Sequence, residues 1–281
     1  MQQHHLYCEN KIATPGSIHY YSLLYTTAEQ RTALTAIYAF CEEVMHAVID
    51  CSETEIAIRK LDWWYEELGR CFRQQPQHPI SHVLQQPIEQ HTLPKEYFDE
   101  ILDGVKMSLE QTVYEQFDDL RLPCYRLGSV PCLLATEVLG YQDRTATNYA
   151  TDLGIALQLT RTIHQLRVAI MRGQLMIPLT DLEQHSLQPE SLINNDNPAH
   201  LQALIADQAK RARDYFQRAE QHLSKTDRKT LLPLRILANI HLALLTAIEN
   251  DGYRVLDVKT DLTPLRMFWI TWRTKTGGLG Y

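Results

Sequence analysis

The sequence predicts an all-α fold, and three observations support this. Apolar residues recur with helical periodicity along most of the 281 residues. Strand-like alternation bounded by hairpin turns is hard to find anywhere. A hydrophobic share of 44% provides ample apolar surface for one large core. We therefore expect a single helical domain over residues 1–281.

The periodic segments follow one another with short breaks. The expected helices cover residues 28–50, 54–73, 77–91, 94–113, 118–139, 145–172, 198–223 and 227–251. Prolines fall at the joins between helices, where a missing N–H group and a fixed φ angle disturb a helix least. These prolines are Pro76, Pro79, Pro94, Pro189 and Pro198. The stretch from Gln184 to His200 is the most loop-like internal segment, but it is too short to separate two domains.

Composition excludes several classes of protein. A net charge of −7 without any dense run of Lys and Arg argues against nucleic-acid binding, which uses several phosphate contacts at once. No apolar run approaches the roughly 20 residues that span a bilayer, and residues 1–10 contain no signal sequence. The six cysteines show no CxxC spacing, so we expect reduced thiols and neither zinc nor disulfides. A cytoplasmic protein is expected.

Two segments resemble the aspartate-rich helices of the squalene/phytoene synthase family. Residues 38–50 read YAFCEEVMHAVID, where the family typically reads YAFCREVDDVVDE. Residues 161–174 read RTIHQLRVAIMRGQ, where NILRDVGEDARRGR is typical, and they follow the family-like run LGIALQLT. The resemblance runs nearly end to end and is closest to the presqualene diphosphate synthases of bacterial hopanoid synthesis. Other residues that carry it include Trp63-Trp64, Arg172-Gly173, Asp251-Gly252-Tyr253 and Leu262-Thr263-Pro264.

This resemblance implies an isoprenoid (terpenoid) synthase fold, with helices around a central apolar cavity. Family members bind two molecules of farnesyl diphosphate in this cavity. The two aspartate-rich helices face each other at the cavity mouth and hold magnesium ions. These ions grip the diphosphate and help it to leave as a carbocation forms.

The sequence departs from the family at the aspartate positions. Met45, His46 and Ile49 replace the first set, and Gln165 and Ala169 replace the second. Magnesium requires hard oxygen ligands in near-octahedral geometry. Methionine, isoleucine and alanine side chains offer no oxygen, imidazole prefers softer metals, and glutamine offers only a neutral carbonyl. We therefore expect no metal, no cofactor and no retained catalytic residue; magnesium is expected only if the protein is an active enzyme.

Other parts of the implied site depart as well. Glu42 stands where the family has an arginine that faces the diphosphate, and Arg161 stands where it has an asparagine. In a third motif Ser129 and Cys132 replace glycines, and Pro131 is expected to distort the helix.

Ligand-binding candidates remain around the implied cavity. They are Ser17, Tyr21, Ser22, Tyr125, Arg126, Gln158, Arg161, His164, Arg167 and Arg172. The cations at 161, 164 and 167 either bind an anionic head group directly or form ion pairs with Glu42 or Glu43. Two alternatives for metal binding remain open: a transition-metal pair of His46 and His164, and a rebuilt carboxylate site of Glu42, Glu43 and Asp50, the last two of which are roughly in phase on a helix.

The leading hypothesis is a catalytically inactive pseudoenzyme with an isoprenoid-binding, assembly or regulatory role. The alternative is an active prenyl-transferring synthase of the presqualene diphosphate or squalene type with an altered metal site. A third class is an interaction module whose cavity is packed shut. Expected partners are an isoprenoid diphosphate or lipid in the cavity and another protein. Membrane contact, at the inner membrane, is expected to be peripheral at most. The basic and amphipathic helix 201–223 is its candidate, but the acids Asp207, Asp214 and Glu220 on this helix favour a solvated face instead.

Overall fold

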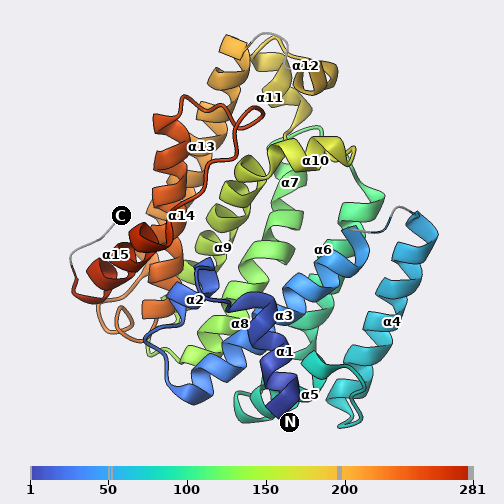
Figure 1. The fold of residues 1–281 in the computed structure, drawn as a ribbon, viewed down its shortest axis with the longest axis vertical. Coiled ribbons are helices and arrows are strands. Elements are labelled where there is room, and N and C mark those ends of the chain that lie inside the picture. Colours follow the sequence, from blue (N-terminus) through green and yellow to red (C-terminus); the bar gives the residue numbers. More distant parts are fainter. Residues whose placement is uncertain (1, 50, 52, 195–197, 278–281) are drawn as a thin grey trace.

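The computed structural model describes residues 2–49, 51, 53–194 and 198–277, and in these ranges every regular element is helical (Figure 1). The all-α prediction is therefore confirmed. The elements are α1 (Gln2–Ile12), α2 (Ile18–Ser22), α3 (Ala28–Ile49), α4 (Thr54–Phe72), α5 (Pro79–Gln90), α6 (Lys95–Glu110), α7 (Phe117–Cys124), the π-helix η1 (Tyr125–Ser129), α8 (Val130–Leu139), α9 (Thr145–His164), α10 (Leu166–Met171), α11 (Leu179–Gln184), α12 (Pro189–Asn194), α13 (Pro198–His222), α14 (Leu232–Asn250) and α15 (Pro264–Lys275).

Two predicted helices are divided. The segment 118–139 is formed by α7, η1 and α8, and the distortion expected at Pro131 appears as the π-helical turn directly before it. The segment 145–172 is not one helix, because the backbone leaves the helical conformation at Gln165, between α9 and α10. Helices α1, α2, α11, α12 and α15 were not predicted. All five have 12 residues or fewer, and therefore few turns in which periodicity can show.

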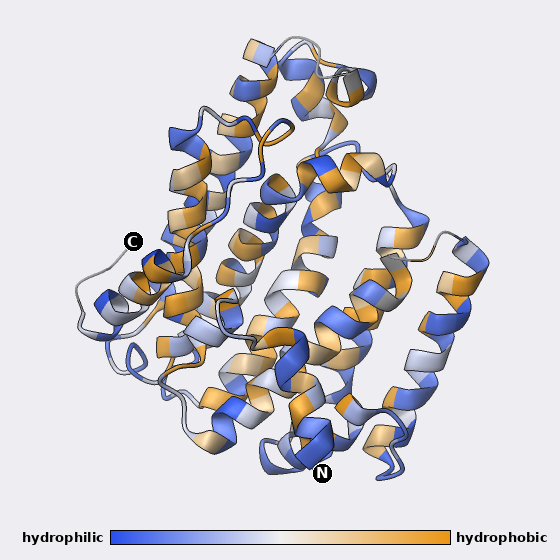
Figure 2. Ribbon diagram, viewed as in Figure 1, coloured by the Kyte–Doolittle hydropathy of each residue, from blue (hydrophilic) through white to orange (hydrophobic). Residues whose placement is uncertain are grey.

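Helix α9 runs through the middle of the molecule and organises the core. It packs against α13 on one side and against η1 and α8 on the other (Figure 1). Tyr149, Leu153 and Ala156 are fully buried along it. Apolar residues concentrate on the inward faces of the surrounding helices, and hydrophilic residues concentrate outside (Figure 2). The C-terminal end of α9 is thereby held in a fixed position beside α3 and α10.

Two glycines allow α9 to approach η1 closely. A Cβ atom added to Gly154 would lie 2.2 Å from the Ser129 Cα, and one added to Gly128 would lie 2.2 Å from the Gly154 carbonyl oxygen. Backbone atoms cannot move away as a flexible side chain can. Ser129 adds a hydrogen bond at this crossing, since its hydroxyl donates to the Thr151 carbonyl at 2.6 Å.

Gly154→Ala is therefore expected to destabilise the fold by roughly 3 kcal/mol or more, because the helices must separate. Urea denaturation of both proteins measures the difference. Gly69→Ala is the matched control, since a Cβ at this helical position meets only the Arg73 side chain, at 3.3 Å or more. The control is expected to be neutral or slightly stabilising. Equal stabilities for Gly154→Ala and Gly69→Ala would contradict the close crossing.

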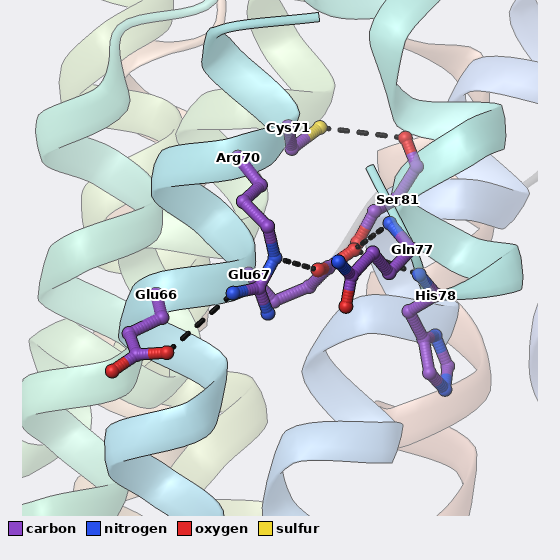
Figure 3. Close-up of polar contacts among 7 residues, drawn as sticks. All are labelled: Glu66, Glu67, Arg70, Cys71, Gln77, His78 and Ser81. Atoms are coloured by element: carbon purple, nitrogen blue, oxygen red, sulfur yellow. Dashed lines mark hydrogen bonds and ion pairs between the residues drawn. The ribbon is translucent and has the colours of Figure 1, made fainter. Parts of the chain in front are cut away.

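A buried carboxylate fixes the connection between α4 and α5 (Figure 3). The Glu67 side chain is fully buried, and its Oε1 accepts hydrogen bonds from the backbone N–H groups of Gln77 and His78, both at 2.8 Å. Its Oε2 accepts from Arg70 Nε at 2.8 Å. Burial alone would raise the pKa of Glu67, but these bonds outweigh it and hold the pKa below its ordinary value. The turn at residues 73–78 thus depends on one ionised side chain.

Helix α14 corrects the expectation that no segment is long and apolar enough to span a bilayer. Its 19 residues meet that criterion by length and composition, with a mean hydropathy of 1.4. However, 61% of this window is buried inside the fold, and α14 packs against α2, α9, α13 and α15. This burial is typical of the core helix of a globular domain.

Candidate functional site

A cavity of 430 Å³ opens where α3, α9 and α10 meet. Helix α3 contributes Met45 and His46, and α9 contributes Gln158 and Arg161 from its last two turns. Side chains of α6, η1, α10 and the segment that joins α14 to α15 complete the wall. The volume lies in the range typical of small-molecule sites. Met171, which would help to fill the cavity in the packed-shut alternative, is instead 79% exposed.

The lining of this cavity is strongly cationic. Arg161, Arg167, Arg172 and Lys259 contribute four positive side chains, and Glu42 is the one carboxylate among the described lining residues. The described lining therefore has a formal charge of +3 with neutral histidines. This is opposite in sign to the chain as a whole, whose net charge is −7. The cavity is suited to an anionic ligand.

Arg161 lies at the centre of the mouth, between α9 and α3. Its Nη2 is 3.2 Å from the Met45 Sδ and 3.8 Å from the Glu42 Oε2. The other oxygen of Glu42 contacts the His46 Nε2 at 2.7 Å. The ion pair of Arg161 is thus long, and Glu42 is shared with His46. Guanidinium N–H groups of Arg161 remain directed at the cavity and can donate to a ligand.

The two glutamates of α3 have different partners. Glu43, considered in the sequence as an alternative partner for the site cations, contacts Lys11 and accepts from the Tyr7 hydroxyl at 3.0 Å. Its proposed companion Asp50 lies outside the described residues, and so does the side chain of Ile49. Glu43 therefore belongs to the contact between α1 and α3.

The segment between α14 and α15 meets the end of α9 at the cavity. His164 Nε2 lies 3.0 Å from the Asp261 Oδ1, and Arg167 Nη1 donates to the Asp257 carbonyl at 3.3 Å. Lys259 Nζ lies 3.0 Å from the other oxygen of Asp261. Burial alone would raise the pKa of Asp261, but its contacts with Lys259 and His164 outweigh burial and lower the pKa. The segment therefore closes one side of the site through charged contacts.

Two further histidines lie behind the mouth. Burial lowers the pKa of His19 and of His241 to about 4, and the nearby charge of Arg161 adds to the effect on both. The His19 ring lies against Tyr38, with centroids 4.4 Å apart, and His241 Nδ1 is 2.8 Å from the Leu237 carbonyl oxygen. Both rings are therefore neutral at pH 7.

This arrangement predicts an acid-sensitive fold. Between the ordinary histidine pKa of 6.5 and about 4, the unfolded chain binds more protons than the folded one. Stability is fully present above pH 6.5 and is expected to fall below it, by about 1 kcal/mol per pH unit for each histidine. Denaturation of wild type and of a His241→Asn variant between pH 7 and about pH 4.5 measures this slope. A stability difference between the two that does not vary with pH would contradict the assignment.

The cavity brings together ten of the residues singled out in the sequence. They are Glu42, Met45, His46, Gln158, Arg161, His164, Gln165, Arg167, Ala169 and Arg172. Helical phase brings the α9 members of this set together, because residues three and four apart share a helix face. Sequence reasoning missed Lys259 and Val255, which line the cavity from an irregular segment. The signal available for them was the family resemblance at Asp251-Gly252-Tyr253, just before them.

Other candidates lie away from the lining. Ser17 caps α2, where its hydroxyl accepts from the Tyr20 N–H at 3.1 Å, and Tyr21 packs with apolar residues of α14 and α15. The Ser22 hydroxyl donates to the His19 carbonyl. Arg126 donates to Glu100 at 2.7 Å and lies 3.4 Å from Asp103, both on α6, and the neighbouring Tyr125 belongs to η1. Ligand contact by these five residues stays a prediction.

Among the described residues, no group of three or more His, Cys, Asp or Glu side chains is arranged to hold a metal ion. At the mouth, His46 and His164 are each placed beside a carboxylate rather than beside each other. The six cysteines, all of which are described, form no disulfide with one another.

The whole fold is that of an isoprenoid synthase. It matches the crystal structure of a dehydrosqualene synthase in complex with ligand, with a TM-score of 0.86 and 18% identity over 98% of this chain and 96% of the other. It also matches squalene synthase HpnC from Alicyclobacillus acidocaldarius, with a TM-score of 0.79 and 21% identity over 90% and 95% of the two chains.

The sequence profile of squalene/phytoene synthases matches residues 13–268, so this chain belongs to the squalene/phytoene synthase family. The family comprises head-to-head prenyltransferases that bind isoprenoid diphosphates. A 15-cis-phytoene synthase of Synechocystis sp. is 26% identical over 276 residues, which cover 94% of this chain and 82% of the relative. A plastid phytoene synthase of an Oncidium hybrid cultivar is 27% identical over 240 residues, and the match covers 58% of its length.

Proposed function

We propose that this protein is a catalytically inactive family member that binds one isoprenoid diphosphate without magnesium. The observation that carries the proposal is the charge of the cavity lining, where four cations face one carboxylate. Aspartates at the positions of Met45, His46, Gln165 and Ala169, as the family resemblance implies, would make the same surface acidic. The replacement of carboxylates by other residues and the gain of Arg161 therefore both make the cavity lining more positive.

Electrostatics connects this charge to the ligand. A diphosphate carries about three negative charges and is repelled by carboxylates unless divalent cations lie between them. Guanidinium groups bind phosphate oxygens directly, often through two parallel hydrogen bonds. Arg161 and Arg167 approach from successive helices, and Lys259 lies in the segment between α14 and α15 that contacts both of these helices. Three cations from three elements can together hold one diphosphate.

The same count of charges argues against synthase chemistry. Head-to-head coupling requires two diphosphates in one cavity, with about six negative charges. The described lining provides a net charge of +3, enough for one of them. Glu42 is the one carboxylate of the described lining that could recruit magnesium, so the second diphosphate lacks a sufficient counter-charge. A single bound isoprenoid fits an assembly or regulatory role in which another protein is the partner. We propose that this role is carried out in the cytoplasm.

Turnover of farnesyl diphosphate with magnesium tests the lack of activity. We expect no squalene-type or phytoene-type product above the reaction without protein. Product formation at rates typical of enzymes, from about 1 s⁻¹ upward, would refute the proposal.

The alternative is an active synthase with an altered metal site, and the cavity positions of Gln158 and Arg172 favour it. Restoring aspartate at positions 45, 46, 49, 165 and 169 separates the two. A dormant scaffold can gain magnesium-dependent activity from this change. An enzyme with a different mechanism would instead lose the activity that it has.

A further inference from the structure

Helix α15 lies at the periphery of the molecule (Figure 1), and it carries a row of exposed apolar side chains. This α15 row consists of Leu265, Phe268, Trp269 and Trp272. Their exposed fractions are 78%, 50%, 50% and 49%, and their i, i+3, i+4 and i+7 spacing places them on one helix face. The opposite face is buried against α2 and α14 and contains Met267, Ile270, Thr271 and Thr274. The row is therefore the outward face of a firmly packed helix.

Cations flank the α15 row on both sides. At 100° per residue, Arg266 and Arg273 lie along one edge of the row and Lys275 lies along the other. The helix contains no Asp or Glu, although the chain as a whole has a net charge of −7. The Arg273 guanidinium lies 5.1 Å from the Trp269 ring centre. Aromatic residues between basic flanks are typical of helices that lie at a membrane surface.

A groove extends this apolar surface inward. Its volume is 500 Å³, and Arg266 and Trp269 form one wall of it. Residues of α13 and α14 form the rest of the lining, with apolar members such as Phe216 and Leu242 beside polar members such as Arg213. The α15 row therefore borders, through Trp269, a recess that is apolar in part.

The charges favour a lipid surface over a second copy of the chain. A two-fold contact would bring two sets of three cations together without a compensating acid on α15. The area is also small: three half-exposed aromatic side chains and one leucine expose roughly 300–500 Å². A stable interface uses about 800 Å² from each partner. Anionic head groups, in contrast, complement the flanking cations.

Helix α13, the membrane-contact candidate from the sequence, is engaged differently. Its apolar face packs on α9. Three of its cations are placed beside carboxylates: Arg211 lies 2.6 Å from Asp181, Arg213 lies 3.1 Å from Glu249, and Arg218 lies 3.4 Å from Asp152. Neither its apolar nor its basic residues are directed at a lipid surface.

We propose that α15 docks the protein on bilayers that contain anionic phospholipids. The α15 row enters the boundary between head groups and acyl chains, and Arg266, Arg273 and Lys275 contact lipid phosphates. The proposal rests on α15 alone and is independent of what the cavity binds. It assigns membrane contact to a helix that sequence reasoning did not identify.

Sedimentation of the full chain with vesicles tests this docking. We expect binding to vesicles of phosphatidylcholine and phosphatidylglycerol in equal amounts, weakening with salt, and little binding to phosphatidylcholine alone. Brominated acyl chains in the anionic vesicles should quench tryptophan fluorescence, because Trp269 and Trp272 enter the acyl boundary. Arg266→Glu/Lys275→Glu should lower partitioning by at least about tenfold. Trp272→Ser should lower partitioning onto the vesicles and reduce the quenching of tryptophan fluorescence.

Matched variants distinguish a loss of docking from a general effect of net charge or of exposed apolar surface. Arg59→Glu/Lys106→Glu changes the net charge equally at exposed positions on α4 and α6, and Ile58→Ser removes an apolar side chain that is 45% exposed. These should bind like wild type, and circular dichroism verifies that every variant is folded. No vesicle binding, equal binding to neutral vesicles, or binding unchanged by the α15 variants would overturn the proposal. Self-association that Trp272→Ser abolishes would overturn it in favour of a second copy.

Discussion

Replacement of Arg161 and Arg167 by alanine is expected to weaken binding of a non-hydrolysable farnesyl diphosphate analogue by about a hundredfold or more. Each guanidinium makes charge-assisted hydrogen bonds, which are worth about 1.5–3 kcal/mol when one partner is charged. Each single loss therefore corresponds to roughly tenfold to hundredfold in affinity. Calorimetric titration of the wild type and the double variant measures the difference. The fold should persist, because neither residue is in the core.

Arg126→Ala provides the matched control for this experiment. Arg126 is bound to Glu100 and Asp103 on α6 and is not among the residues that line the cavity. Its removal is expected to change affinity by less than about twofold while costing some stability. If Arg126→Ala weakens binding as strongly as the double variant does, the head group lies elsewhere, and the assignment of the cavity is wrong.

Glu67→Gln is expected to lower the free energy of unfolding by about 2–4 kcal/mol at pH 7. The amide cannot accept from the Gln77 and His78 N–H groups and from Arg70 as the carboxylate does, and it removes the closer of the two carboxylates beside the partly buried Arg70 guanidinium. Because the pKa of Glu67 is lowered in the folded state, its contribution is present above the ordinary value of 4.5. This contribution is lost as the pH falls through the folded-state pKa. The difference between wild type and variant should therefore shrink in acid.

Glu66→Gln is the control for this site. Glu66 lies one residue earlier on α4, is 72% exposed at its side chain, and contacts Arg70 only at 3.5 Å. A change of less than about 0.5 kcal/mol is expected for this exposed ion pair. Urea unfolding at pH 7 and in acid measures both variants. Similar small effects of the two substitutions at pH 7 would show that the Glu67 cluster does not anchor the α4–α5 turn.

The sequence allowed the long helices to be predicted because their apolar periodicity extends over several turns. Helix α13 was expected at 198–223 and is found at Pro198–His222. The break at Gln165 could not be predicted, because no proline or glycine marks it and the apolar pattern continues beyond it. Helix α15 was missed for a different reason: large apolar residues lie on both of its faces, so no single amphipathic stripe appears.

Site residues that lie on the same helix could be predicted from the sequence to lie together. Arg161 and His164 lie three apart on α9, and helical phase is sufficient to place them together. Lys259 could not be placed, because it lies in an irregular segment whose path depends on tertiary contacts such as that between His164 and Asp261. Ser17 illustrates the opposite case, since its hydroxyl is used locally as a helix cap.

Calorimetric titration with the farnesyl diphosphate analogue, in magnesium and in chelator, tests the central claim most directly. The cationic lining of Arg161, Arg167, Arg172 and Lys259 predicts one bound analogue per chain with the same affinity in both solutions. Binding that requires magnesium would contradict the claim and favour an active synthase. Absence of binding in both solutions would also contradict it, because the cavity would then not be a diphosphate site.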